Sequence, residues 1–210
     1  MAVEKTIRLK VCGMREAENI RDVAALHPDY MGFIFYRDSK RFVGDAFSIS
    51  DDFPETIKRV GVFVNEMPQE IIRLADKHAL DYVQLHGKES VKQCEDLRNH
   101  GLGVIKVFAI ANDFNFGEVN SYRNNVDYFL FDTKGKNFGG NGVAFNWEIL
   151  EKYDQEIPFF LGGGISAGNV AGVRSLKGMN LHALDVNSGV ESEVGVKDVM
   201  KIREFENLRI

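Results

Sequence analysis

Cysteine is scarce in this chain, with only Cys12 and Cys94, and the two are too far apart to form a CxxC motif. Such a pair builds neither a disulfide framework nor a zinc site. The chain also lacks an HExxH motif and any cluster of cysteines and histidines, so no sequence feature calls for a metal. We therefore expect free thiols, no bound metal and a cytoplasmic location.

Long apolar runs and an excess of positive charge are missing as well. The longest apolar stretches, such as Tyr30 to Tyr36, are too short to cross a bilayer, and the N-terminus has no signal-peptide-like apolar region. The net charge of −5 gives no electrostatic reason to bind nucleic acid or an anionic membrane, although it does not exclude a local basic pocket. The 210 residues, 44% of them hydrophobic, suffice for one domain covering residues 1–210.

Short apolar segments alternate with helical segments along the chain at a spacing of roughly 25 residues. The sequence predicts strands over 7–12, 30–35, 59–65, 81–86, 103–110, 126–133, 158–161 and 184–186. It predicts helical segments over 16–26, 45–56, 89–99, 113–124, 146–153 and 196–207, and two more that begin near Pro68 and Ala167. Within 45–56, Ser48, Ser50 and Pro54 interrupt the apolar face, so this second helical segment should be irregular. The alternation indicates a parallel sheet.

Two architectures fit such an alternation. A doubly wound open sheet usually carries a GxGxxG motif after its first strand, whereas this chain has Cys12-Gly13-Met14 there and its glycines cluster late. Eight repeated units favour a (β/α)8 TIM barrel, near the lower size limit of that fold.

Glycine-rich turns follow the last two predicted strands, at 162–164 and at 187–189. Because glycine has no Cβ, the backbone N–H groups of such turns can approach a ligand closely, and a following helix N-terminus favours an anion. The turns after strands seven and eight form the phosphate site of many barrels. We therefore predict a phosphorylated small-molecule ligand, although either turn alone could be a plain connection.

Polar residues also occupy the strand ends, where barrel enzymes bind their ligands. Cys12 could be a small buried residue or a functional thiol, and Asp132 could cap a turn or transfer a proton in a low-dielectric pocket. Arg41 could clamp a carboxylate or lie on the surface. Asp185 should point away from the phosphate, toward a ligand hydroxyl. The glycine-rich stretch 134–142 could be a lid or an ordinary connection.

These motifs, taken in order over essentially the whole chain, resemble the phosphoribosylanthranilate isomerase family. The matching segments are Lys10–Met14, Gly32–Tyr36, Ser39–Arg41, Val60–Asn65, Val83–Gly87, Phe131–Lys134, Gly139–Gly142, Phe145–Trp147, Gly163–Ile165 and Asp185–Glu191. Each motif alone is weak, but their combination is specific.

The resemblance implies an isomerase of tryptophan biosynthesis that needs no cofactor. It would convert N-(5′-phosphoribosyl)anthranilate, an aminoaldose, to the aminoketose 1-(2-carboxyphenylamino)-1-deoxyribulose 5-phosphate. Cys12 matches the general base, Asp132 the general acid and Arg41 the residue that holds the anthranilate carboxylate. Asp185 matches a residue near the ribose hydroxyls. The remaining matches are to phosphate-binding residues (Gly163, Gly164, Ser188, Gly189) and substrate contacts (Gln84, His86).

Two other functions use the same barrel. Another phosphosugar isomerase or epimerase would need a pair of acid/base aspartates and usually metal-binding histidines, whereas only His86 is well placed here. A non-catalytic phosphoribosyl-ligand-binding barrel would be expected to have lost the cysteine at position 12 or the aspartate at position 132, and both Cys12 and Asp132 are present. A monomer and a homodimer are both compatible with the sequence.

Overall fold

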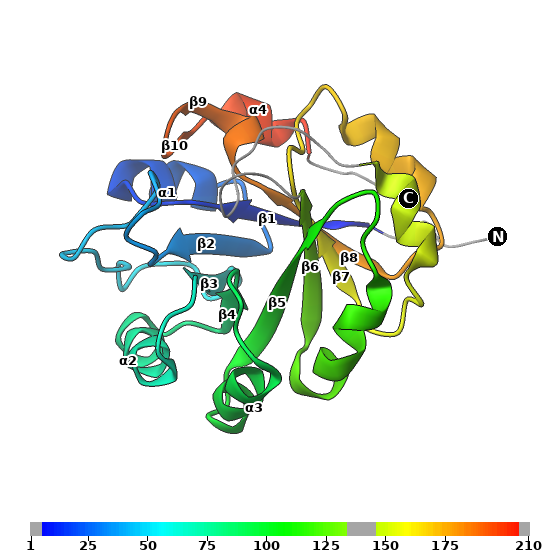
Figure 1. Cartoon of the computed structure of the whole chain (residues 1–210). Helices are drawn as coiled ribbons and strands as arrows, with labels where there is room; N and C mark the ends of the chain where they lie inside the picture. The colour runs from blue at the N-terminus through cyan, green and yellow to red at the C-terminus, as the bar shows by residue number, and fades with distance from the viewer. Residues whose placement is uncertain (1–5, 134–145, 206–210) are drawn as a thin grey trace.

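Eight parallel strands, each hydrogen-bonded to its neighbours in chain order, close into a barrel (Figure 1). The computed structural model describes residues 6–133 and 146–205. The strands are β1 Arg8–Cys12, β2 Tyr30–Ile34, β3 Lys58–Phe63, β4 Tyr82–Leu85, β5 Gly103–Ile110, β6 Tyr128–Thr133, β7 Phe159–Leu161 and β8 Leu181–Val186. The barrel closes where Arg8 to Val11 of β1 pair with Ala183 to Val186 of β8. The predicted (β/α)8 barrel is confirmed.

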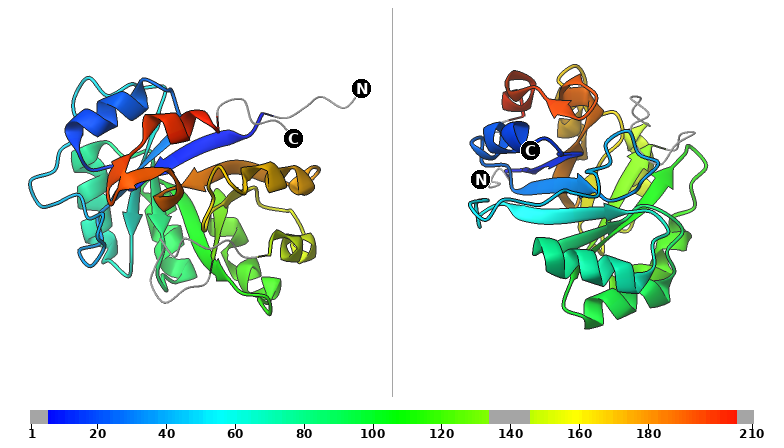
Figure 2. Two further views of the ribbon diagram at one scale, coloured as in Figure 1. Left: turned by 90° about the horizontal axis from the view of Figure 1, so that it is seen from above. Right: turned by 90° about the vertical axis from the view of Figure 1, so that its left-hand side faces the viewer.

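Helices surround the strands, as the perpendicular views show (Figure 2). In the first half of the chain they are the α-helices α1 Ala17–Ala24, α2 Pro68–His78 and α3 Val91–Asn99. In the second half, 3-10 helices take their place: η1 Phe116–Asn125, η2 Trp147–Lys152 and η3 Val170–Leu176. Local signals explain the starts of the regular helices: Pro68 opens α2, and Ser90 and Gln93 form a capping box on α3.

The segment at 45–56, predicted to be an irregular helical segment, is irregular but forms no helix: residues 43–57 between β2 and β3 consist of turns and irregular backbone. Two aromatic rings of this segment do the packing that a helix would have done. The rings of Phe47 and Phe53 lie 5.5 and 6.1 Å from the ring of Phe33 on β2. The segment therefore covers the outer face of β2 without a helix.

The chain after β8 also differs from the prediction of one helix over 196–207. The short helix η4 Ser188–Val190 leads into a hairpin of β9 Glu191–Glu193 and β10 Val196–Lys197, and α4 begins only at Val199 and ends at Arg203. Gly195 turns the hairpin with a φ of +88°. The hairpin lies against α1 (Figures 1 and 2), because the buried amide of Asn19 exchanges two 2.8 Å hydrogen bonds with the backbone of Lys197.

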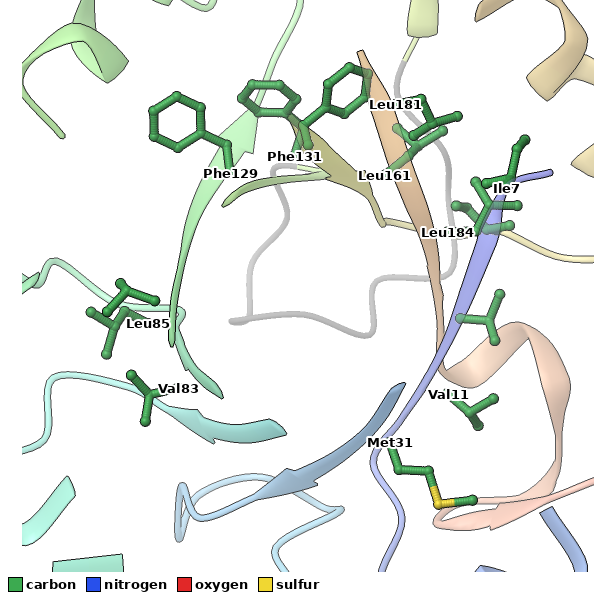
Figure 3. Packing of buried hydrophobic residues seen from close by; sticks show 14 of the residues in the cluster. Ile7, Val11, Met31, Val83, Leu85, Phe129, Phe131, Leu161, Leu181 and Leu184 are labelled. Atoms are coloured by element: carbon green, nitrogen blue, oxygen red, sulfur yellow. The ribbon is translucent and has the colours of Figure 1, made fainter. Parts of the chain in front are cut away.

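Apolar side chains fill both faces of the barrel wall. On the outer face, side chains such as Phe129, Phe131 and Val83 point away from the barrel centre toward the helices (Figure 3). Within the described residues, no helix is long and apolar enough to cross a membrane.

The barrel interior is packed in layers, so it is a core and not a channel. One inner cluster holds Tyr30, Val60, Ile105, Val107, Leu130, Phe160 and Ala183, with Tyr82 and Tyr128 against it. A second cluster of Cys12, Ile34 and Val62 is separate from the first. Cys12 ends β1, so this second cluster lies toward the carboxyl ends of the strands and forms a floor beneath the barrel mouth.

Candidate active site

A pocket of about 620 Å³ lies at the carboxyl ends of the strands. All ten residues that the sequence analysis selected line it, although they come from six different parts of the chain. They are Cys12, Arg41, Gln84, His86, Asp132, Gly163, Gly164, Asp185, Ser188 and Gly189. The strand order explains this convergence, because parallel strands of one barrel end at the same rim.

Cys12 is buried at the end of β1, beside a charged residue that sequence reasoning missed. Lys10 lies two residues earlier on the same inward face, is fully buried, and pairs through Nζ with Asp185 Oδ1 at 2.7 Å. Burial alone would lower the pKa of Lys10, but the charges of Asp185 and Cys12 outweigh it, so its pKa is raised and it stays an ammonium ion.

The same environment sets the proton affinity of the Cys12 thiol. Burial raises the pKa of Cys12, and the Lys10 ammonium opposes that rise by favouring the thiolate. Gly32 on β2 gives the sulfur its room, because a Cβ there would lie 2.7 Å from Sγ. The thiol is therefore held in a fitted space beside a permanent positive charge.

Asp185 was predicted to point toward a ligand hydroxyl, and the structure adds a partner inside the protein. Its Oδ1 pairs with Lys10, so the carboxylate that shares a turn with the glycine-rich segment is neutralised. This pairing removes most of the repulsion that a bare carboxylate would exert on a bound anion.

Asp132 ends β6 on another part of the rim and is 7% exposed. Its Oδ1 accepts a 2.7 Å hydrogen bond from the backbone N–H of Thr133. Its Oδ2 lies 3.2 Å from Nε2 of His86, and Nδ1 of His86 lies 3.3 Å from Nε2 of Gln84. Gln84 and His86 are two residues apart and share the inward face at the end of β4, as the strand period predicts.

Arg41 lines the pocket, as expected of a residue that binds a ligand carboxylate, but in the structure it is already paired with a carboxylate of the protein, that of Glu191. Its Nε and Nη2 donate to the two carboxylate oxygens of Glu191 at 2.7 and 2.6 Å. Nζ of Lys197 lies 2.7 Å from the same carboxylate, and the N–H of Gly195 donates to it. Although burial opposes it, these contacts with Arg41 and Lys197 lower the pKa of Glu191 to about 2. Glu191 and Lys197 were not predicted as site residues.

The two glycine-rich turns meet next to Asp132. Gly163 and Gly164 have φ values of +81° and +69°, which side chains rarely adopt. A Cβ on Gly163 would lie 2.3 Å from Thr133 Oγ1, and one on Gly189 would lie 2.0 Å from the carbonyl oxygen of Ile165. Only glycine therefore fits at these two positions. The stretch 134–142, predicted as a lid or a connection, lies outside the described residues.

Comparison with known proteins agrees with this geometry. Residues 9–208 match the family model for N-(5′-phosphoribosyl)anthranilate (PRA) isomerase. The N-(5′-phosphoribosyl)anthranilate isomerase of Parabacteroides distasonis is 44% identical over 200 residues, which are 94% of this chain and 90% of that protein.

Solved structures are similar over the same length. The phosphoribosyl anthranilate isomerase of Thermotoga maritima superposes with a TM-score of 0.81 and 32% identity, covering 95% of this chain and 96% of that one. A phosphoribosyl anthranilate isomerase in complex with reduced 1-(o-carboxyphenylamino)-1-deoxyribulose 5-phosphate superposes with a TM-score of 0.79 and 32% identity, covering 96% and 97% of the two chains.

The closed parallel barrel, with a buried cysteine, a buried aspartate and two glycine-rich turns around one pocket at its rim, defines an enzyme of the (β/α)8-barrel class. Within that class, the chain belongs to the N-(5′-phosphoribosyl)anthranilate isomerase family.

Proposed function

We propose that this chain converts N-(5′-phosphoribosyl)anthranilate to 1-(2-carboxyphenylamino)-1-deoxyribulose 5-phosphate in tryptophan biosynthesis, with Cys12 as the general base and Asp132 as the general acid. The observation that carries the proposal is the convergence of both side chains on one pocket with the two glycine-rich turns. An aldose-to-ketose rearrangement of a phosphorylated sugar needs these three parts: an acid, a base and a phosphate cradle.

In the first step, Asp132 delivers its proton to the oxygen of the ribose ring. The O–H bond forms, the bond between this oxygen and C1 breaks, and the lone pair of the anilino nitrogen forms the C=N bond of a Schiff base. The negative charge left on Asp132 is stabilised by the N–H donor of Thr133 at 2.7 Å.

In the second step, the Cys12 thiolate removes the proton from C2. The electrons of that C–H bond form a C1=C2 double bond, and the C=N electrons return to nitrogen, which gives an enaminol. Its conversion to the ketose adds one proton at C1 and removes one from the hydroxyl at C2. The nearby Lys10 ammonium favours the anionic form of Cys12 that this step needs.

Phosphate recognition falls to the turns after β7 and β8. Asn187, Ser188 and Gly189 line the same pocket as Gly163 and Gly164, and the backbone N–H groups of the two adjoining turns can surround an anion. The glycines leave no Cβ between this backbone and the ligand. A Gly164→Asp substitution should therefore weaken substrate binding strongly, by adding both bulk and like charge.

Arg41 can still hold the anthranilate carboxylate while it is paired with Glu191. A guanidinium group has two bidentate edges, and Glu191 occupies the one formed by Nε and Nη2. The other edge, formed by Nη1 and Nη2, is left for a second carboxylate. In this arrangement Glu191 fixes the orientation of Arg41, and Lys197 holds Glu191 in place.

The test is a fluorescence assay that follows the loss of phosphoribosylanthranilate with purified protein. The unchanged enzyme should consume the substrate, and Asp132→Asn and Cys12→Ser should each lower kcat by ~10²–10⁴-fold, the usual range for one general acid or base. Both variants should still bind a product analogue, because neither residue makes the main phosphate or carboxylate contact. A Cys12→Ser enzyme with near-normal kcat would show that the thiol only fills space.

A further inference from the structure

The imidazole of His86 lies between two polar side chains, and its two nitrogens have different partners. Its Nε2 is 3.2 Å from Oδ2 of Asp132, the general acid proposed above. Its Nδ1 is 3.3 Å from Nε2 of Gln84, which is 1% exposed. Gln84, His86 and Asp132 thus form one chain of side chains along the wall of the pocket.

The chemistry of the three groups decides where the histidine proton lies. A neutral imidazole carries a proton on one nitrogen and accepts a hydrogen bond at the other. In the structure the nitrogen of the Gln84 amide faces Nδ1 and can only donate, so in this orientation Nδ1 is the acceptor and the proton lies on Nε2. In this tautomer the histidine donates to the Asp132 carboxyl group.

From this geometry we propose that Gln84 is a positioning residue of the reaction, because it fixes the tautomer of His86 that supports the general acid. The inference rests on the proposed acid role of Asp132. As Asp132 gives its proton to the ring oxygen, Nε2–H of His86 and N–H of Thr133 donate to its two oxygens and stabilise the forming carboxylate. In the opposite tautomer, the lone pair of Nε2 would face this carboxylate and repel it.

A second observation ties the orientation of this amide to the tautomer. Oε1 of Gln84 is buried and has no hydrogen-bond partner among the described residues, so its retention at this position calls for an explanation. Rotation of the amide by half a turn would turn Oε1 toward Nδ1, which suits only the opposite tautomer, with the proton on Nδ1. The orientation in which Nε2 of Gln84 faces Nδ1 is therefore the one that keeps the proton of His86 on Nε2.

Asp132 can regain its proton without a change in the histidine. The conversion of the enaminol to the ketose releases the proton of the C2 hydroxyl, which replaces the one that Asp132 gave to the ring oxygen, so His86 keeps its proton on Nε2 throughout. Lys10 and Asp185 pair with each other and Arg41 pairs with Glu191, so none of these charges replaces the contact between His86 and Asp132.

The test is Gln84→Met, which keeps the length of the side chain and removes its amide. We expect kcat to fall roughly tenfold, a part of the ~10²–10⁴-fold that one general acid contributes, with little change in KM. Nitrogen-15 NMR of the whole enzyme should show His86 protonated on Nε2 before the substitution and as a mixture of tautomers after it. His100, on the surface, provides the reference signal in the same spectra.

Gln69→Met, at an exposed position of α2, is the matched control and should change neither readout. Gln84→Glu provides a second variant, since a carboxylate at this position would accept from Nδ1–H and should lower kcat further than methionine does. If Gln84 only contacts substrate, KM will rise and the tautomer will not move, which overturns the inference. A His86 protonated on Nδ1 in the unchanged enzyme would overturn it too.

The result for Asp132→Asn separates this inference from the function on which it rests. An inactive Asp132→Asn enzyme together with a fully active Gln84→Met enzyme would refute only the role of Gln84. An active Asp132→Asn enzyme would instead refute the assignment of the general acid.

Discussion

On the β1 and β8 side of the pocket, Cys12 lies beside two buried charges, whereas on the β4 and β6 side Asp132 ends a hydrogen-bonded chain that starts from an uncharged amide. Lys10 and Asp185 are 0% and 11% exposed at their side chains and stabilise each other at 2.7 Å. The Gln84–His86–Asp132 chain has longer contacts of 3.2 and 3.3 Å.

The difference fits what each side would do in the proposed mechanism. A thiol becomes a base only as its anion, so a positive charge nearby favours the proposed base. A carboxyl group that donates its proton is left as an anion, so hydrogen-bond donors favour the proposed acid. We therefore expect loss of the Lys10–Asp185 pair to lower mainly the stability of the protein, and loss of the Gln84–His86 contact to lower mainly its turnover.

Lys10→Met should have the largest effect on folding. Breaking a buried ion pair leaves the partner charge uncompensated, which typically costs 3–5 kcal/mol, so the free energy of unfolding should fall by about this amount. Urea unfolding measures it, and the double variant Lys10→Met/Asp185→Asn should recover part of the loss. Gln84→Met should lower the free energy of unfolding by clearly less than Lys10→Met. Equal losses of stability in these two variants would contradict the difference between the two sides of the pocket.

Arg41→Met should raise KM by about 10–100-fold with a smaller change in kcat, because a charge-assisted bidentate contact contributes roughly 1.5–3 kcal/mol. Lysine at this position should restore binding only in part, since a point charge cannot reproduce the fork. Glu191→Gln should raise KM by less, because Arg41 is retained but loses its fixed orientation. Arg37→Met is the matched control, as that guanidinium is exposed and paired with Asp45.

The pH dependence of kcat/KM should reflect the titration of the Cys12 thiol. Because burial raises the pKa of Cys12 above its ordinary value of 9.0, little thiolate exists near neutral pH, and kcat/KM should still be increasing as the pH passes 9. The rise should vanish in Cys12→Ser. A flat profile over this range for the unchanged enzyme would contradict a buried thiol as the base.

Stability should fall in acid, because the Glu191 carboxylate, which is paired with Arg41 and Lys197, becomes protonated. The pKa of Glu191 drops from 4.5 to about 2 in the folded protein, so its stabilisation is complete above pH 4.5 and is lost as pH falls toward 2. Glu191→Gln should flatten the pH dependence of the unfolding free energy in this window. An unaltered slope would show that the carboxylate gains nothing from Arg41 and Lys197.

The smallest effect on activity should come from Cys94→Ser. Cys94 is a fully buried residue of the outer core on α3, and burial raises its pKa to about 11. We expect a modest loss of stability and an unchanged kcat, in contrast to Cys12→Ser. A kcat that falls in both variants would mean that serine at either position disturbs the barrel.

Much of the fold could be predicted because strands and regular helices carry local patterns. The eight strands were located to within a few residues, and Pro68 and Ser90 mark helix starts directly. The segment at 45–56 and the hairpin at 191–197 could not be predicted, because their structure is set by distant partners. Phe47 and Phe53 pack on Phe33, and Lys197 bonds to Asn19, which is 178 positions away.

The pocket residues could be predicted because the rim of a barrel collects the polar residues at strand ends. The buried charges of Lys10, Glu191 and Lys197 could not be predicted as site residues, because each acts through a partner that only the fold brings close. Lys10 and Asp185 are 175 positions apart, and Arg41 and Glu191 are 150 apart. The one available signal was the spacing of Lys10 and Cys12 in β1: residues two apart on a strand point to the same face.

The most direct test of the central claim, that the two halves act at different steps, is the kinetic isotope effect on kcat with substrate deuterated at C2. In Cys12→Ser, removal of the C2 proton should limit the rate and show a full primary isotope effect. In Asp132→Asn, ring opening should limit the rate, and the isotope effect should be close to one. Equal isotope effects in the two variants would contradict the division of acid and base between the two sides of the pocket.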